Sequence, residues 1–120
     1  MSLSPRKVVV VADRDVIVLA LICHILTRQG YQTQPVTDPH SLGSIVESGN
    51  FDAIIVDAAV DGILDKLRKR PAIASRVIVT TAESLDVSGV WACLQRPLEF
   101  GQLVQVVRAC ANQNRPLTDS

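Results

Sequence analysis

A buried strand is predicted by the stretch NFDAIIVDAAVDG, residues 50–62. Its apolar residues 53–56 run without interruption into Asp57, which is typical of a strand covered on both faces of a parallel sheet. A second apolar run, residues 8–12, leads in the same way into Asp13. Each aspartate therefore either caps the next element or belongs to a chemical site.

The composition predicts one globular domain and argues against several functional classes. The chain has 120 residues, of which 48% are apolar and 3% aromatic, so the core is expected to be aliphatic. A net charge of zero and no basic stripe argue against nucleic acid or a membrane surface as partner. Residues 16–23, the longest apolar run, are too few to span a bilayer, and no secretory signal is expected.

The three cysteines have no CxxC spacing, which argues against a disulfide framework or a zinc site. They are interpreted as small buried residues in a reducing compartment. A cytoplasmic location is therefore expected.

Strand and helix patterns alternate along the chain. The strand patterns cover residues 8–12, 31–36, 51–56, 76–80 and 90–95. The helix patterns cover residues 13–29, 39–48, 61–70 and 98–111. This order predicts an α/β fold, a doubly wound sheet of five parallel strands with helices on both faces. We expect a single domain over residues 1–120, with its core at about residues 7–111 and polar tails at both ends.

Chemically active side chains follow four of the predicted strands. They are Asp13 after the first strand, Asp57 after the third, Thr80 and Thr81 at the fourth, and Arg96 after the fifth. The carboxyl ends of parallel strands meet at one edge of the sheet, where such folds bind ligands. Two carboxylates, a hydroxyl pair and a cation are therefore expected to converge there.

Over about residues 7–111 the sequence resembles the receiver domain of two-component response regulators. The segments that carry the resemblance are VVVVADRD (8–15), FDAIIVD (51–57), VIVTTA (77–82) and CLQRPLEFGQLVQVV (93–107). The resemblance implies a flavodoxin-like fold and a non-enzymatic module that takes a phosphoryl group from a histidine kinase or phosphotransfer protein. It would then signal by conformational change.

Two other functions remain open. One is a phosphorylation-independent pseudo-receiver that acts as a protein–protein interaction module. The other is a flavodoxin-like domain that binds a small molecule, although no Gly-rich phosphate loop follows residues 8–12.

The resemblance also implies roles for residues at the sheet edge. Asp57 is the expected phospho-acceptor, the Thr81 hydroxyl would bond the phosphoryl group, and Arg96 would pair with it. The expected Mg²⁺ ligands are Asp13, Asp57, the backbone carbonyl of Ala59 and, as a further candidate, Asp15.

Two substitutions depart from the usual receiver pattern at this edge. Arg14 stands at the second acidic position, where its guanidinium is expected to replace the cation, pair with Asp57 and weaken or abolish metal binding. Arg96 stands in place of the usual lysine and keeps the charge. Pro97, next in the chain, indicates the cis peptide of the family.

Two segments are shorter than the pattern requires. Only residues 58–60 separate Asp57 from the Asp-Gly pair that follows, which leaves the carbonyl of Ala59 in question as a ligand. Only 14 residues, 82–95, lie between Thr81 and Arg96. The fourth helix of the fold is therefore expected to be a single turn or absent.

The first helix pattern has more apolar residues than one buried face needs. The predicted core face consists of Val18, Leu21, Ile22, Ile25 and Leu26. The apolar residues off that face are Val16, Ile17, Leu19 and Cys23. Either neighbouring loops cover them or a partner does, and a homodimer through this helix is one prediction.

Overall fold

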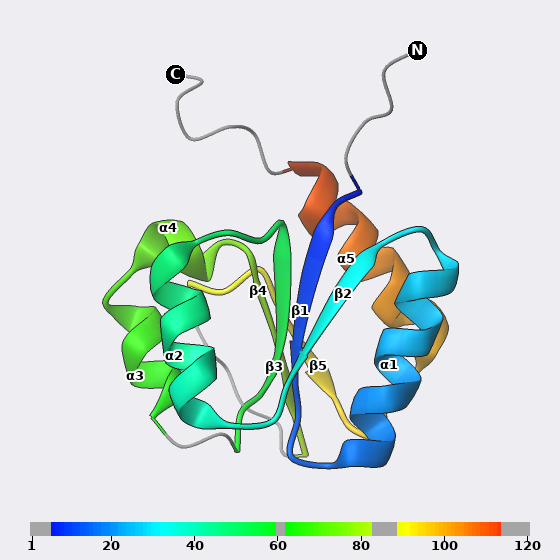
Figure 1. The fold of residues 1–120 in the computed structure, drawn as a ribbon, viewed down its shortest axis with the longest axis horizontal. Coiled ribbons are helices and arrows are strands. Elements are labelled where there is room, and N and C mark those ends of the chain that lie inside the picture. The colour runs from blue at the N-terminus through cyan, green and yellow to red at the C-terminus, as the bar shows by residue number, and fades with distance from the viewer. Residues whose placement is uncertain (1–5, 60–61, 83–88, 114–120) are drawn as a thin grey trace.

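A computed structural model describes residues 6–59, 62–82 and 89–113 of the chain, and it contains one parallel sheet of five strands (Figure 1). The strands lie in the order β2-β1-β3-β4-β5. Their bounds are β1 Val8–Ala12, β2 Gln32–Val36, β3 Ala53–Asp57, β4 Val77–Thr81 and β5 Ala92–Gln95. The predicted five-stranded parallel sheet is therefore confirmed.

Helices cover both faces of this sheet (Figure 1). Their bounds are α1 Val16–Arg28, α2 Pro39–Ser48, α3 Ile63–Arg68, α4 Pro71–Ala74 and α5 Phe100–Gln113. Figure 1 shows α1 and α5 on one face and α2, α3 and α4 on the other. Within the described ranges, no helix combines the length and the hydrophobicity needed to cross a membrane.

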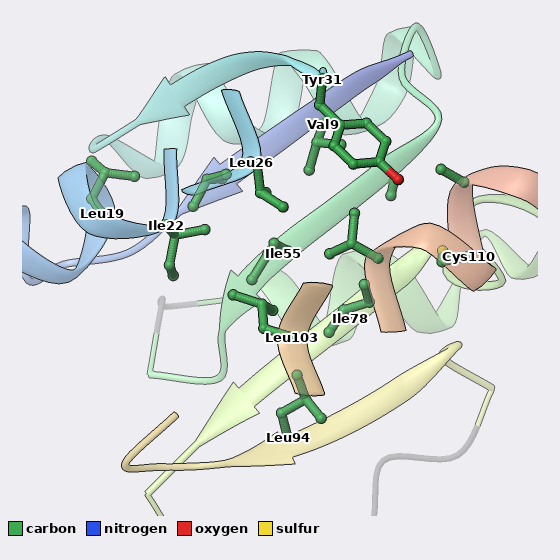
Figure 2. Packing of buried hydrophobic residues seen from close by; sticks show 14 residues of the cluster. Val9, Leu19, Ile22, Leu26, Tyr31, Ile55, Ile78, Leu94, Leu103 and Cys110 are labelled. Carbon is green, nitrogen blue, oxygen red and sulfur yellow. The ribbon is translucent and has the colours of Figure 1, made fainter. Parts of the chain in front are cut away.

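The two faces of the sheet bury separate aliphatic clusters because alternate strand residues point to opposite sides. Val10 and Ala12 of β1 pack on the α2 side, whereas Val9 and Val11 pack toward α1 and α5. Figure 2 shows the second cluster, in which Ile22 and Leu26 of α1 face Ile55 of β3 and Leu103 of α5. Fully burying one such side chain stabilises the fold by about 1.5–3 kcal/mol.

The start of α1 differs from the prediction. The helix begins at Val16, and Asp15 rather than Asp13 is its N-cap. Asp15 Oδ1 accepts hydrogen bonds from the backbone amides of Ile17, at 2.9 Å, and Val18, at 3.3 Å. Asp13 is thereby free of the capping role and is available to the edge of the sheet.

The buried face of α1 is also rotated from the predicted one. The buried residues are Leu19, Ile22 and Leu26, and Leu21 is 43% exposed. The predictions for Leu19 and Leu21 were therefore wrong. Because this helix is apolar nearly all round, periodicity does not fix which stripe meets the sheet.

The segment after β3 contains two short helices instead of one. The helix predicted over residues 61–70 is α3, which ends at Arg68, and α4 begins at Pro71 as a separate single turn. Proline suits the first position of a new helix because its missing amide has no intrahelical partner there. The shortened fourth helix between β4 and β5 was predicted over a segment that includes residues 83–88, which lie outside the described part of the chain.

Candidate functional site

A cavity of about 750 Å³ opens at the carboxyl end of the sheet. Its lining includes Asp13, Arg14, Asp15, Asp57, Thr81 and Arg96. Each follows or ends a strand, or lies in the turn between β1 and α1. The structure thus brings two strand-end carboxylates, a hydroxyl and a guanidinium into one cavity.

Asp57 is the last residue of β3, and its side chain is 13% exposed. Its Oδ1 accepts a hydrogen bond from the Ala59 amide at 3.0 Å. Its Oδ2 lies 3.9 Å from Arg96 Nη2, which is ion-pair distance but too long for a hydrogen bond. Oδ2 is therefore the less engaged of the two oxygens, and it faces a cation.

Arg96 follows β5 and is held at the cavity by its backbone and its side chain. Its backbone amide donates to the Thr81 carbonyl at 2.7 Å. Its Nη2 donates to Asp13 Oδ2 and, at 3.1 Å, to Thr80 Oγ1. One guanidinium nitrogen thus joins Asp13 to Thr80 and also faces Asp57.

Asp13 is buried, with 3% of its side chain exposed, and both of its oxygens are engaged. Oδ1 accepts a hydrogen bond from the Asp15 amide at 2.8 Å, while Oδ2 accepts the one from Arg96. Asp15 is exposed, and its Oδ1 caps α1. Each of these two carboxylates therefore accepts hydrogen bonds from backbone amides two or three residues further along the chain.

Arg14 lines the cavity and is exposed, but it does not pair with Asp57. In the described ranges, the side chain within ion-pair distance of Asp57 is that of Arg96. The predicted Arg14–Asp57 pair is therefore wrong. The hydrogen bond from the Asp15 amide to Asp13 folds this turn so that residue 14, between them, lies on the outside.

The two threonines at the end of β4 have different positions. Thr81 is 7% exposed and lines the cavity. Thr80 is fully buried, is the register partner of Asp57, and accepts the hydrogen bond from Arg96. The sequence predicted a role for Thr81 but no contact for Thr80, although the alternation of side chains along a strand already separates two successive residues.

The Arg96–Pro97 peptide bond is cis, as predicted. Ala59 lies at the edge of the cavity, and the segment that follows it includes residues 60 and 61, outside the described part of the chain. The assignment of its carbonyl as a metal ligand stays a prediction.

The sequence was compared with protein-family models and with curated proteins. No protein-family model matches the chain. Among curated proteins it is 26% identical to the DNA-binding transcriptional regulator NtrC of Azospirillum brasilense, over 90% of this chain and 25% of that protein. The chain thus spans about a quarter of the length of that relative.

Solved structures give the fold. The receiver domain of Francisella response regulator 1452 matches with a TM-score of 0.81 and 22% identity, over 92% of this chain and 100% of that one. The chain has the fold of a response-regulator receiver domain. The Thermotoga maritima response regulator TrrA, solved with Mg²⁺ and BeF, matches with a TM-score of 0.74 and 21% identity, over 87% and 98% of the two chains.

The residues at the edge of this receiver fold do not fit Mg²⁺ as they stand. Mg²⁺ requires octahedral oxygen coordination and binds through carboxylates and waters. In the described ranges, no three His, Cys, Asp or Glu side chains are grouped to hold a metal. The Oδ2 atoms of Asp13 and Asp57 do converge, but they converge on Nη2 of Arg96. A guanidinium already lies between the two carboxylates.

Proposed function

We propose that the chain is the receiver domain of a two-component response regulator, in which Asp57 accepts a phosphoryl group from a histidine kinase or phosphotransfer protein. The observation that carries the proposal is the position of Asp57. It ends β3 of a receiver fold, and its less engaged oxygen lies beside a guanidinium in a cavity that Thr81 also lines. The module itself is proposed as an acceptor of phosphoryl groups and not as an enzyme, and we place it in the cytoplasm.

Asp57 Oδ2 is the proposed nucleophile. It attacks the phosphorus of a phosphohistidine, the P–N bond breaks, and its electron pair stays on the imidazole nitrogen, which takes a proton from solvent. The product is an aspartyl phosphate. The hydrogen bond from the Ala59 amide to Oδ1 holds the carboxylate in place before the attack.

Arg96 supplies the positive charge that phosphoryl transfer needs. Phosphoryl transfer is catalysed mainly by positioning and by charge stabilisation of the transferred oxygens. A guanidinium 3.9 Å from Oδ2 can turn toward these oxygens and bind two of them. In its present position, the buried Nε of Arg96 has no hydrogen-bond partner in the described part of the chain. Because an unpaired buried donor costs about 1–3 kcal/mol, a new acceptor nearby favours this movement.

The same movement would carry the signal. Arg96 now binds the carboxylate of Asp13, so a phosphoryl group on Asp57 competes with Asp13 for the guanidinium. Thr81, whose backbone carbonyl accepts the Arg96 amide, also lines the cavity, and its hydroxyl is proposed to bind the phosphoryl group. Linked displacements of this kind shift a domain between two discrete states.

Acetyl phosphate, a small phosphoryl donor, tests the proposal when the products are weighed by intact mass spectrometry. We expect the wild type to gain one phosphoryl group and Asp57→Asn to gain none. Asp52→Asn is the matched control, because Asp52 precedes the same strand and its carboxylate accepts the Val8 amide at its other end. A wild type that gains no mass, or an Asp57→Asn protein that gains as much, would support the pseudo-receiver hypothesis.

A further inference from the structure

The edge of the sheet contains its own cation. The closest contact between opposite charges there joins Arg96 Nη2 to Asp13 Oδ2, and Asp57 Oδ2 lies 3.9 Å from the same nitrogen. The two carboxylates thus converge on a single guanidinium nitrogen. Two carboxylate oxygens that face one point are the arrangement that attracts a metal ion, and here a side chain fills that point.

Arg96 is held between the two carboxylates of the unphosphorylated domain by both its backbone and its side chain. Its backbone amide bonds to Thr81, and its Nη2 bonds to Thr80, whose side chain is fully buried. Only 20% of the Arg96 side chain is exposed. Unlike a bound metal ion, this guanidinium is part of the chain, so it is present at any metal concentration.

The arginines of the cavity already neutralise most of its negative charge. Its lining includes three carboxylates, Asp13, Asp15 and Asp57, and two arginines, Arg14 and Arg96, so a divalent ion meets a formal charge of −1 where the carboxylates alone would give −3. Mg²⁺ would have to displace Arg96 from Asp13 and remain close to it. Mg²⁺ and the guanidinium would then repel each other. This repulsion is stronger in a partly buried cavity than in water, although weaker than in a dry protein interior.

We infer that Arg96 takes the place of a divalent metal ion in this receiver fold, so that the cavity binds phosphoryl oxygens against guanidinium groups and does not require Mg²⁺. Arg14, which is exposed and also lines the cavity, is a second arginine there. The statement about phosphoryl oxygens rests on the proposed function. The statement about the metal ion rests on Asp13, Asp57 and Arg96 alone.

Metal binding by the unphosphorylated protein tests the inference without any phosphoryl transfer. Mg²⁺ is titrated into the protein by calorimetry, and Mn²⁺, which prefers the same oxygen ligands, is followed by the broadening of backbone amide NMR signals. The wild type is expected to show no saturable binding at millimolar metal. Saturable binding with selective broadening at Asp13, Asp57 and Ala59 would overturn the inference.

Substitutions of Arg96 test whether removing the guanidinium creates a binding site for Mg²⁺. Arg96→Gln removes the charge between the two carboxylates, and we expect its affinity for Mg²⁺ to rise on the order of tenfold or more. Arg96→Lys restores the lysine of the usual receiver pattern without the guanidinium fork, and it should gain affinity for Mg²⁺ as well, but less than Arg96→Gln does. The matched control is Arg108→Gln, an exposed arginine of α5 whose guanidinium bonds Gln29. Equal affinities for Arg96→Gln and Arg108→Gln would contradict the inference, and should Arg96→Gln fail to fold, the wild-type titration still decides.

The acetyl phosphate reaction in EDTA separates this inference from the proposed function. Labelling of Asp57 that persists in EDTA supports both. Labelling that EDTA abolishes and Mg²⁺ restores overturns metal independence and leaves Asp57 as the acceptor. If the protein is unlabelled both with and without Mg²⁺, the proposed role of Asp57 as phospho-acceptor is refuted. The metal titration alone then decides whether Arg96 replaces the metal ion.

Discussion

The ion pair between Asp13 and Arg96 should make a measurable contribution to the stability of the domain. Asp13→Asn keeps the shape of the side chain and an oxygen to accept the Asp15 amide, but it removes the charge that Arg96 contacts. Arg96 then keeps Thr80 at 3.1 Å and a carboxylate at 3.9 Å. The variant therefore isolates one charged interaction.

The expected magnitude follows from the burial of the two partners. Breaking a fully buried ion pair costs about 3–5 kcal/mol, and a hydrogen bond to a charged group is worth about 1.5–3 kcal/mol. Asp13 is 3% exposed, but Arg96 is 20% exposed, so water compensates part of the loss. We expect Asp13→Asn to lower the free energy of unfolding by about 1.5–3 kcal/mol.

A double-mutant cycle with Arg96→Gln measures the interaction itself. Unfolding in urea is followed by circular dichroism for the wild type, both single variants and the double variant. The coupling free energy should be about 1–2 kcal/mol, because residues in direct contact couple by about 0.5–3 kcal/mol. Single effects that add to within about 0.5 kcal/mol would refute a stabilising pair. Arg108→Gln serves as the surface control and should change stability by less than about 0.5 kcal/mol.

Three further predictions concern the core and the outer face of α1. Burial raises the pKa of the Cys110 thiol from 9.0 to about 11, so the folded protein binds the thiol proton more tightly than the unfolded chain does. The free energy of unfolding should therefore fall as the pH rises from 9.0 toward 11. An alkylating reagent at pH 8 should label half-buried Cys93 before buried Cys110, and equal labelling rates would contradict this. Arg76→Met removes the donor of two hydrogen bonds to backbone carbonyls, at 3.1 and 3.2 Å, and should cost about 2–4 kcal/mol in urea unfolding; a change below about 0.5 kcal/mol would show that these bonds contribute nothing. Leu19→Glu should unfold the domain because Leu19 is only 6% exposed. Ile17→Glu should stay folded because Ile17 is 70% exposed. Its solution mass, measured by light scattering, should be lower than that of the wild type only if α1 forms a homodimer.

The fold was predictable because local pattern and final environment agree along most of the chain. β1 and β3 are continuous aliphatic runs, and such runs are stable only where both faces of a strand are covered. The convergence of Asp13, Asp57 and Arg96 was predictable from topology alone, since parallel strands end at one edge.

The details that the sequence did not predict depend on the direction of single side chains. Arg14 and Arg96 are both guanidinium groups near the same carboxylates, and the choice between them is made by the turn that directs Arg14 outward. Leu19 was missed because an apolar helix offers several stripes to the sheet, and the orientation of the packed helix selects one. Thr80 gains its role only through a contact with Arg96, 16 residues further along the chain.

Localisation of the phosphoryl group tests directly whether Asp57 is the acceptor. After reaction with acetyl phosphate, sodium borohydride reduces an aspartyl phosphate to homoserine and releases phosphate, and peptide mass spectrometry then identifies the converted residue. We expect homoserine at residue 57, in the wild type and in Asp52→Asn alike. Conversion at another aspartate, or no conversion in a folded wild type, would show that Asp57 is not the acceptor.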